Sequence, residues 1–248
     1  MADRLRAPQS PRTAVVWSVL RSALEGLDGQ DAPIKVLDSG GGSGLFAVPL
    51  AELGHQVTVV DASPDALAVL LRRAAEAGVA ERVHPVQGDA DNLLDVVDES
   101  SFHLVLCHSL LEVVDDPANS VRAIAETLVP GGYASILAAN RHAGVLSRAL
   151  SGHFADARTA LVDPSGRSGP ADAALRRFDL DTLTALVAKA GLTVLQTHGV
   201  RVVADLVPGA LLDGEPGALD ALRELELAAS ETPPFRDIAT QLHVLAKR

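Results

Sequence analysis

The stretch that decides the fold is Val36-Leu37-Asp38-Ser39-Gly40-Gly41-Gly42-Ser43-Gly44, an apolar run followed by four glycines within five residues. The apolar residues predict a strand over 34–38, and residues 45–53 predict a helix that begins directly after the glycines. Glycine permits positive φ and lets a ligand approach the backbone without a Cβ in the way. Because the loop leads into a helix N-terminus, its free N–H groups can bind a ligand there.

On either side of this loop, short apolar runs alternate with amphipathic helical stretches. Strands are predicted over residues 34–38, 56–60, 82–87, 102–107, 133–139, 193–203 and 238–246, and helices over 10–27, 45–53, 63–77, 117–128, 179–190 and 218–229. This alternation predicts an α/β fold with a doubly wound, mostly parallel seven-stranded sheet, to which the last two strands give an antiparallel edge strand. Residues 140–178 break the rhythm and are expected to form an inserted lid.

We expect one domain over residues 1–248. It would comprise an N-terminal helical segment (1–33), a ligand-binding core (34–139), the insertion (140–178) and the C-terminal part of the sheet (179–248). No run approaches the ~18 apolar residues of a transmembrane helix, and the first residues lack the apolar centre of an export signal, so we expect a cytoplasmic protein without a membrane partner. Nothing in the sequence indicates an oligomeric state.

The composition excludes several other classes of site. The one cysteine, Cys107, rules out a disulfide within the chain, and no His, Asp or Glu cluster has metal-ligand spacing, so no metal is expected. The formal charge of -11 would repel a phosphate backbone, and a nucleic-acid partner would therefore need a local basic patch.

Acidic residues follow three successive predicted strands, at the edge of the sheet where ligands bind: Asp38, Asp61 and Asp89. Gly42-x-Gly44-x-x-Ala47 also fits the dinucleotide fingerprint, and an acid after the second strand suits ribose hydroxyls in either case. Asp38 would repel a pyrophosphate but suits an ammonium or sulfonium, and Asp89 can accept a hydrogen bond from an adenine amino group. The pattern favours S-adenosylmethionine (SAM), with a NAD-binding reductase or a non-catalytic SAM-binding module as alternatives.

Several motifs carry a resemblance to known families. Asp38-x-Gly40-x-Gly42-x-Gly44, Asp61, Asp89 and the turn Leu128-Val129-Pro130-Gly131-Gly132 resemble the Rossmann-like class I SAM-dependent methyltransferases. Residues 102–117 are similar to the bacterial tRNA methyltransferases that esterify 5-carboxymethoxyuridine at the wobble position. Looser similarity to that family extends to Arg12-x-Ala14-x-x-Trp17, Asn140-x-His142-x-Gly144 and residues 199–205, 222–226 and 238–244.

The resemblance implies a SAM site and an acceptor site. Carried over by position, cofactor contacts are implied for Arg12, Gly40, Gly41, Asp61, Asp89, Ala90 and His108, to which the strand ends and the loop add Asp38, Gly42 and Ala62. A carboxylate acceptor is ionised at neutral pH, so methyl transfer to it needs alignment and exclusion of water rather than a general base. Arginine binds carboxylates with paired hydrogen bonds, so the candidates for orienting the acceptor are Arg201, Arg177 and Arg141, with His142 beside them.

The partner implied by the resemblance is tRNA. Residues 140–177 contain six arginines and three aspartates, which makes this segment the basic part of an acidic chain and the place where an RNA phosphate would bind. The family's lysine-rich tract in this segment has no counterpart in residues 157–167. That departure favours the alternative of a small-molecule O- or N-methyltransferase.

Overall fold

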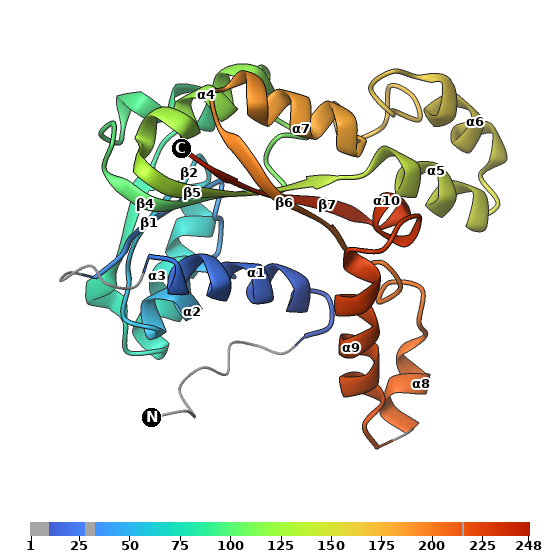
Figure 1. The fold of residues 1–248 in the computed structure, drawn as a ribbon, viewed down its shortest axis with the longest axis horizontal. Coiled ribbons are helices and arrows are strands. Elements are labelled where there is room, and N and C mark those ends of the chain that lie inside the picture. The colour runs from blue at the N-terminus through green and yellow to red at the C-terminus, as the bar shows by residue number, and fades with distance from the viewer. Residues whose placement is uncertain (1–9, 28–32, 215) are drawn as a thin grey trace.

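A seven-stranded sheet in the order β3-β2-β1-β4-β5-β7-β6 forms the centre of the computed structural model, which describes residues 10–27, 33–214 and 216–248 (Figure 1). The strands are β1 (Lys35–Ser39), β2 (Gln56–Asp61), β3 (Val83–Gln87), β4 (Phe102–His108), β5 (Leu128–Ala139), β6 (Thr193–Val200) and β7 (Gln241–Lys247). The first five strands pair in parallel, and β7 runs antiparallel to both β5 and β6. The doubly wound sheet and its antiparallel edge are confirmed, with β7 placed between β5 and the edge strand β6.

Helices cover both faces of the sheet (Figure 1). The helices are α1 (Ala14–Glu25), α2 (Ala47–Glu52), α3 (Pro64–Glu76), α4 (Pro117–Thr127), α5 (Arg141–Leu150), α6 (Phe154–Val162), α7 (Leu180–Lys189), α8 (Gly209–Gly214), α9 (Ala218–Ser230) and α10 (Phe235–Ile238), with 3-10 turns η2 (Ala80–Arg82) and η3 (Ala90–Asp95). Neighbouring side chains of each strand point to opposite faces. Val36 therefore packs in the cluster that includes α1, α2 and α3, whereas Leu37 packs in the cluster that includes α4 and α7.

The starts of α3 and α4 follow the expected capping chemistry. Ser63 accepts a hydrogen bond from the Ala66 N–H, and proline occupies the first turn of α3. Asp116 caps α4 in the same way. The start of α1 differs from the prediction: the Thr13 N–H donates to the Ser10 carbonyl in a turn, so the helix begins at Ala14. Residues 1–9 and 28–32 of the expected N-terminal segment lie outside the described residues.

Other element ends also differ from the predictions, and β5 begins at Leu128, within the stretch expected to be a turn, rather than at residue 133. β6 stops at Val200 rather than residue 203, because Arg201 has a φ of 60°, which a strand does not accommodate. The helices α8 and α10 have no counterpart in the sequence prediction, and α10 shortens the last strand at its start.

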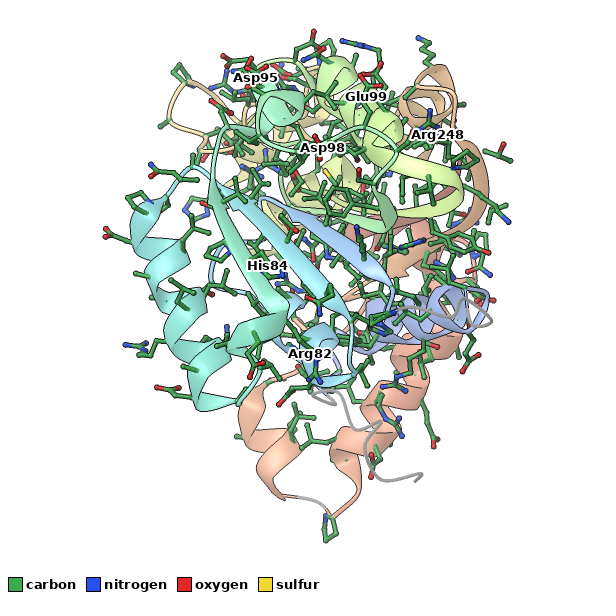
Figure 2. The ribbon with its side chains drawn as sticks, turned by 90° about the vertical axis from the view of Figure 1, so that its left-hand side faces the viewer. Arg82, His84, Asp95, Asp98, Glu99 and Arg248 are labelled. Carbon is green, nitrogen blue, oxygen red and sulfur yellow. The ribbon has the colours of Figure 1, made fainter. Side chains whose placement is uncertain are left out.

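At the opposite side of the sheet, Figure 2 shows His84 on the edge strand β3, with Asp95, Asp98 and Glu99 in the connection to β4.

The insertion forms α5 and α6, which pack on each other and extend beyond the end of the sheet (Figure 1). It rejoins the sheet through an isolated bridge between Asn140 and Phe178, directly before α7. Within the described ranges, every helix is too short or too polar to cross a membrane.

Candidate active site

Three cavities lie in a row at the carboxyl ends of the parallel strands, and each shares residues with the next. The inner cavity, about 480 Å³, is lined by Gly40, Asp61, Ala62, Asp89 and Ala90, among others. The central cavity, about 530 Å³, shares Gly40 and Ser109 with it. The outer cavity, about 560 Å³, lies against α5 and shares Arg201 with the central one.

The glycine loop after β1 packs closely against neighbouring side chains at the edge of the central cavity. Gly40 has a φ of 73°, and a Cβ there would lie 2.9 Å from Leu110. A Cβ on Gly41 would lie 2.4 Å from the carboxyl carbon of Asp38, closer than real contacts allow. Both glycines line the central cavity. Glycine is therefore required at these two positions, because a Cβ would collide with neighbouring side chains of the chain itself.

Asp38 is a buried carboxyl, 3% exposed, at the end of β1 beside the central cavity. Burial, and secondly the charge of Asp61, raises the pKa of Asp38 from its ordinary 3.8 to about 7. A positively charged ligand group beside it would favour the ionised form and reverse this shift. The position therefore suits a cation and disfavours a phosphate.

The inner cavity is acidic. Asp61, Asp89, Asp91 and Asp115 line it, and none of the described residues that line it is basic. Asp61 holds the loop in place by accepting hydrogen bonds from the N–H groups of Gly42 and Ser63, each at 2.9 Å. Asp89 caps η3 by accepting from the Asp91 N–H at 3.1 Å. These carboxylates suit hydroxyl and amino groups of a nucleoside, and their charge opposes a dinucleotide pyrophosphate.

Aromatic rings and a neutral histidine form the wall of the central cavity. The His108 ring meets Phe46 edge-on at 4.7 Å, and its Nε2 lies 2.9 Å from Ser135 Oγ. Burial lowers the pKa of His108 to about 3, so the ring is neutral at physiological pH and a weak base. It is suited to packing beside a ligand rather than to accepting a proton from one.

Arg12 and Arg201 approach the central cavity from opposite ends of the chain. Both line it, and both form ion pairs with Asp205; the Arg12 Nε lies 3.1 Å from Asp205 Oδ1. Arg201 also lines the outer cavity. Arg201 therefore lies at the passage where the two cavities meet, with its guanidinium paired to Asp205.

The other acceptor-orienting candidates occupy different positions from those expected. Arg177 lines the outer cavity, but its Nη1 and Nη2 donate to the two oxygens of Asp172 at 2.7 and 2.9 Å. These bonds hold the pKa of Asp172 well below its ordinary range. Arg177 therefore fastens the insertion.

Arg141 and His142 line none of the three cavities. Arg141 donates to the Asp163 carbonyl at 3.1 Å, and His142 Nδ1 lies 3.1 Å from the Asp237 carbonyl. Both side chains bind groups of neighbouring segments, and Arg141 also pairs with Asp179. Gly42 also stays outside the cavity linings, since its N–H binds Asp61.

Sequence reasoning missed several residues that line the site. Gln241 begins β7 and donates from Nε2 to Ser109 Oγ at 2.9 Å, and Phe46 and Leu137 complete the central cavity. A polar residue at the start of the final strand was the available signal for Gln241. No group of three or more His, Cys, Asp or Glu side chains within the described ranges has the geometry to hold a metal.

Comparison with known proteins agrees with this geometry. Residues 36–132 match the family model described as a methyltransferase domain. A tRNA 5-carboxymethoxyuridine methyltransferase from Escherichia coli O157:H7 is 27% identical over 237 residues, which cover 96% of this chain and 88% of the relative. A ubiquinone biosynthesis O-methyltransferase from Xanthomonas axonopodis pv. citri (strain 306) is 36% identical over 123 residues, half of each chain. The solved SAM-dependent methyltransferase from Mesorhizobium loti has a TM-score of 0.62 at 18% identity, covering 94% of this chain and 98% of that one.

The sheet, the glycine loop and the matched domain together define the class: this chain is a SAM-dependent methyltransferase with the class I fold, and SAM is its methyl donor. Within that class, it resembles the tRNA 5-carboxymethoxyuridine methyltransferases along nearly its whole length.

Proposed function

We propose that this enzyme methylates the carboxylate of 5-carboxymethoxyuridine at the wobble position of tRNA. The observation that carries the proposal is the place of Arg201, a residue that lines both the central and the outer cavity. With the donor in the inner and central cavities, an acceptor in the outer cavity would contact Arg201 where the central and outer cavities meet. The similarity to the Escherichia coli relative over 96% of the chain supports the choice of acceptor.

Different residues would bind the methyl donor and the acceptor. Asp38 would bind the ammonium group of SAM, Asp61 the ribose hydroxyls, and Asp89 the adenine amino group. Bound SAM supplies a methyl group on a positively charged sulfur. Arg201 would bind the acceptor carboxylate with two charge-assisted hydrogen bonds and align one oxygen with the methyl carbon.

Methyl transfer to a carboxylate needs no general base. The carboxylate oxygen forms the new bond to the methyl carbon while the carbon–sulfur bond breaks, and its electron pair stays on sulfur. The products are a neutral methyl ester and a neutral thioether, so no proton is gained or lost. A neutral His108 with a pKa of about 3 is compatible with this chemistry. Alignment and exclusion of water by the cavity walls then supply the rate enhancement.

A small-molecule O-methyltransferase is the second candidate, and the mouth of the outer cavity favours it. Leu146, Leu150, Leu206 and Ile238 line this cavity and are between 40% and 73% exposed. Four of the six arginines expected to attract RNA phosphates also bind groups within the chain: Arg141, Arg148, Arg176 and Arg177. An apolar acceptor with one anionic group would suit such a cavity.

Labelled methyl transfer separates the two candidates. The enzyme is incubated with SAM carrying a radiolabelled methyl group and with an anticodon stem-loop RNA that holds either 5-carboxymethoxyuridine or uridine at the wobble position. The proposal predicts label only in the carboxymethoxy RNA, released by mild alkali because methyl esters hydrolyse there. Label in a phenolic small-molecule acceptor, with none in either RNA, would establish the second candidate instead.

A further inference from the structure

Glu226 is a fully buried carboxylate on α9 that belongs to none of the three cavities as the described residues line them. Its Oε2 accepts the Val202 N–H at 2.9 Å, and its Oε1 accepts the N–H groups of Val203 and Ala204, each at 2.7 Å. A buried charge is costly without partners. Three short, charge-assisted bonds from successive backbone groups compensate it and fix that backbone in one conformation.

The backbone that Glu226 holds is the loop that leaves β6 and carries Arg201. Arg201 has a φ of 60°, a left-handed conformation that residues with a Cβ adopt only under constraint from their surroundings. The next three N–H groups all point to Glu226, so the turn at Arg201 is fixed from its C-terminal side. The same loop ends at Asp205, which pairs with Arg201 and accepts from Thr240 Oγ1 at 3.2 Å.

This loop joins the two substrate cavities. Arg201 lines both of them, Asp205 lines the outer one, and the ion pair of Asp205 with Arg12 reaches the wall of the central one. A change in the loop backbone would therefore move the guanidinium of Arg201 away from the passage. Glu226 itself touches neither cavity, so an effect on catalysis would act through the loop.

We propose that Glu226 is a positioning residue for methyl transfer: by binding the N–H groups of residues 202–204, it holds Arg201 in the left-handed conformation that places its guanidinium between the donor and the acceptor. The inference rests on the proposed function, because it concerns the arginine assigned to the acceptor carboxylate. Removing the charge of Glu226 should weaken alignment of the acceptor and leave most of the SAM site intact.

The test compares Glu226→Gln with Glu224→Gln, the same chemical change two residues away on the exposed side of α9. Glutamine keeps the shape of glutamate but has one accepting oxygen, and its NH₂ group opposes one of the three loop N–H groups. Loss of charge-assisted bonds of this kind predicts a fall of about 10- to 100-fold in kcat/KM for the carboxymethoxy stem-loop RNA. The Kd for SAM, measured by calorimetry, should change less than about threefold, and Glu224→Gln should match the wild type in both measurements.

A double-mutant cycle distinguishes positioning from a general loss of structure. If Glu226 acts through Arg201, then Arg201→Gln and the double variant with Glu226→Gln have the same kcat/KM, since the arginine to be positioned is already gone. Multiplicative losses in the double variant would overturn the proposal. If Glu226→Gln does not fold, Glu226→Asp, whose shorter side chain cannot reach all three N–H groups, takes its place in the same cycle.

The two proposals can fail separately. A wild-type enzyme that does not esterify the stem-loop RNA contradicts the proposed function. A wild-type enzyme that esterifies it, together with a folded Glu226→Gln enzyme of unchanged kcat/KM, contradicts only the positioning role.

Discussion

Replacing Asp38 with asparagine should stabilise the free protein and remove most of its affinity for SAM. Asp38 is 3% exposed, and burial beside Asp61 raises its pKa from 3.8 to about 7. The folded chain therefore keeps this proton up to about pH 7, whereas the unfolded chain releases it near pH 3.8. Between these values the folded state binds more protons, so this group lowers the free energy of unfolding as pH rises, and its effect levels off above pH 7.

The size of the effect follows from the difference between the two pKa values. At 1.36 kcal/mol for each pH unit, a shift from 3.8 to about 7 corresponds to about 4 kcal/mol of destabilisation at pH 8. Asparagine carries no charge at any pH and avoids this cost. Asp38→Asn should therefore raise the free energy of unfolding by up to about 4 kcal/mol at pH 8 and by little near pH 4. Urea unfolding at the two pH values measures both differences.

The pH dependence of the affinity for SAM should be opposite to that of the free energy of unfolding. Wild-type affinity should rise with pH, by up to about tenfold per unit below pH 7, because the cationic ligand pairs with the ionised carboxylate. Asp38→Asn should lose most of the affinity and all of this pH dependence in calorimetry. Asp95→Asn, a change at an exposed position (Figure 2), is the control and should behave as the wild type. An Asp38→Asn protein that is no more stable at pH 8, or that binds SAM as tightly as the wild type, would refute the reasoning.

Three further changes test the site and its support. Gly41→Ala places a Cβ 2.4 Å from the Asp38 carboxyl carbon and should weaken SAM binding at least ~10-fold in calorimetry, while circular dichroism stays unchanged. Ser135→Ala leaves two buried histidine nitrogens without their shared partner and should cost about 1–3 kcal/mol in urea unfolding; no loss would mean that the bridge contributes nothing. Asp172→Asn breaks the ion pairs that fasten the insertion and should speed amide hydrogen exchange across α5. Because the pKa of Asp172 is lowered on folding, its stabilisation exists above the unfolded pKa and is lost as pH falls below it, so wild type and variant should converge in acid.

The parallel part of the sheet was predictable because local sequence and tertiary structure agree there. Val36 and Leu37 pack on opposite faces of one strand, so a continuous apolar run is what that position requires. The glycines after it give the backbone conformations and close contacts that other residues do not allow. The acids at the strand ends meet because parallel strands end at one edge of the sheet. The cofactor half of the site follows from these local features.

The acceptor half depends on contacts between segments far apart in the chain. Arg177 was indistinguishable from Arg201 in the sequence, and each pairs with an aspartate, but Arg177 lines the outer cavity alone whereas Arg201 lines both cavities. β6 ended early because Glu226, 25 residues beyond Arg201, draws the next backbone N–H groups out of the strand. Secondary-structure propensity and residue spacing do not reveal such contacts between residues far apart in the chain.

The most direct test of the account is a crystal structure of the enzyme with S-adenosylhomocysteine and a stem-loop RNA containing 5-carboxymethoxyuridine. We expect the amino end of the nucleoside beside Asp38, its adenosine beside Asp61 and Asp89, and the acceptor carboxylate about 3 Å from the guanidinium of Arg201. A carboxylate bound elsewhere, with Arg201 still paired only to Asp205, would contradict it.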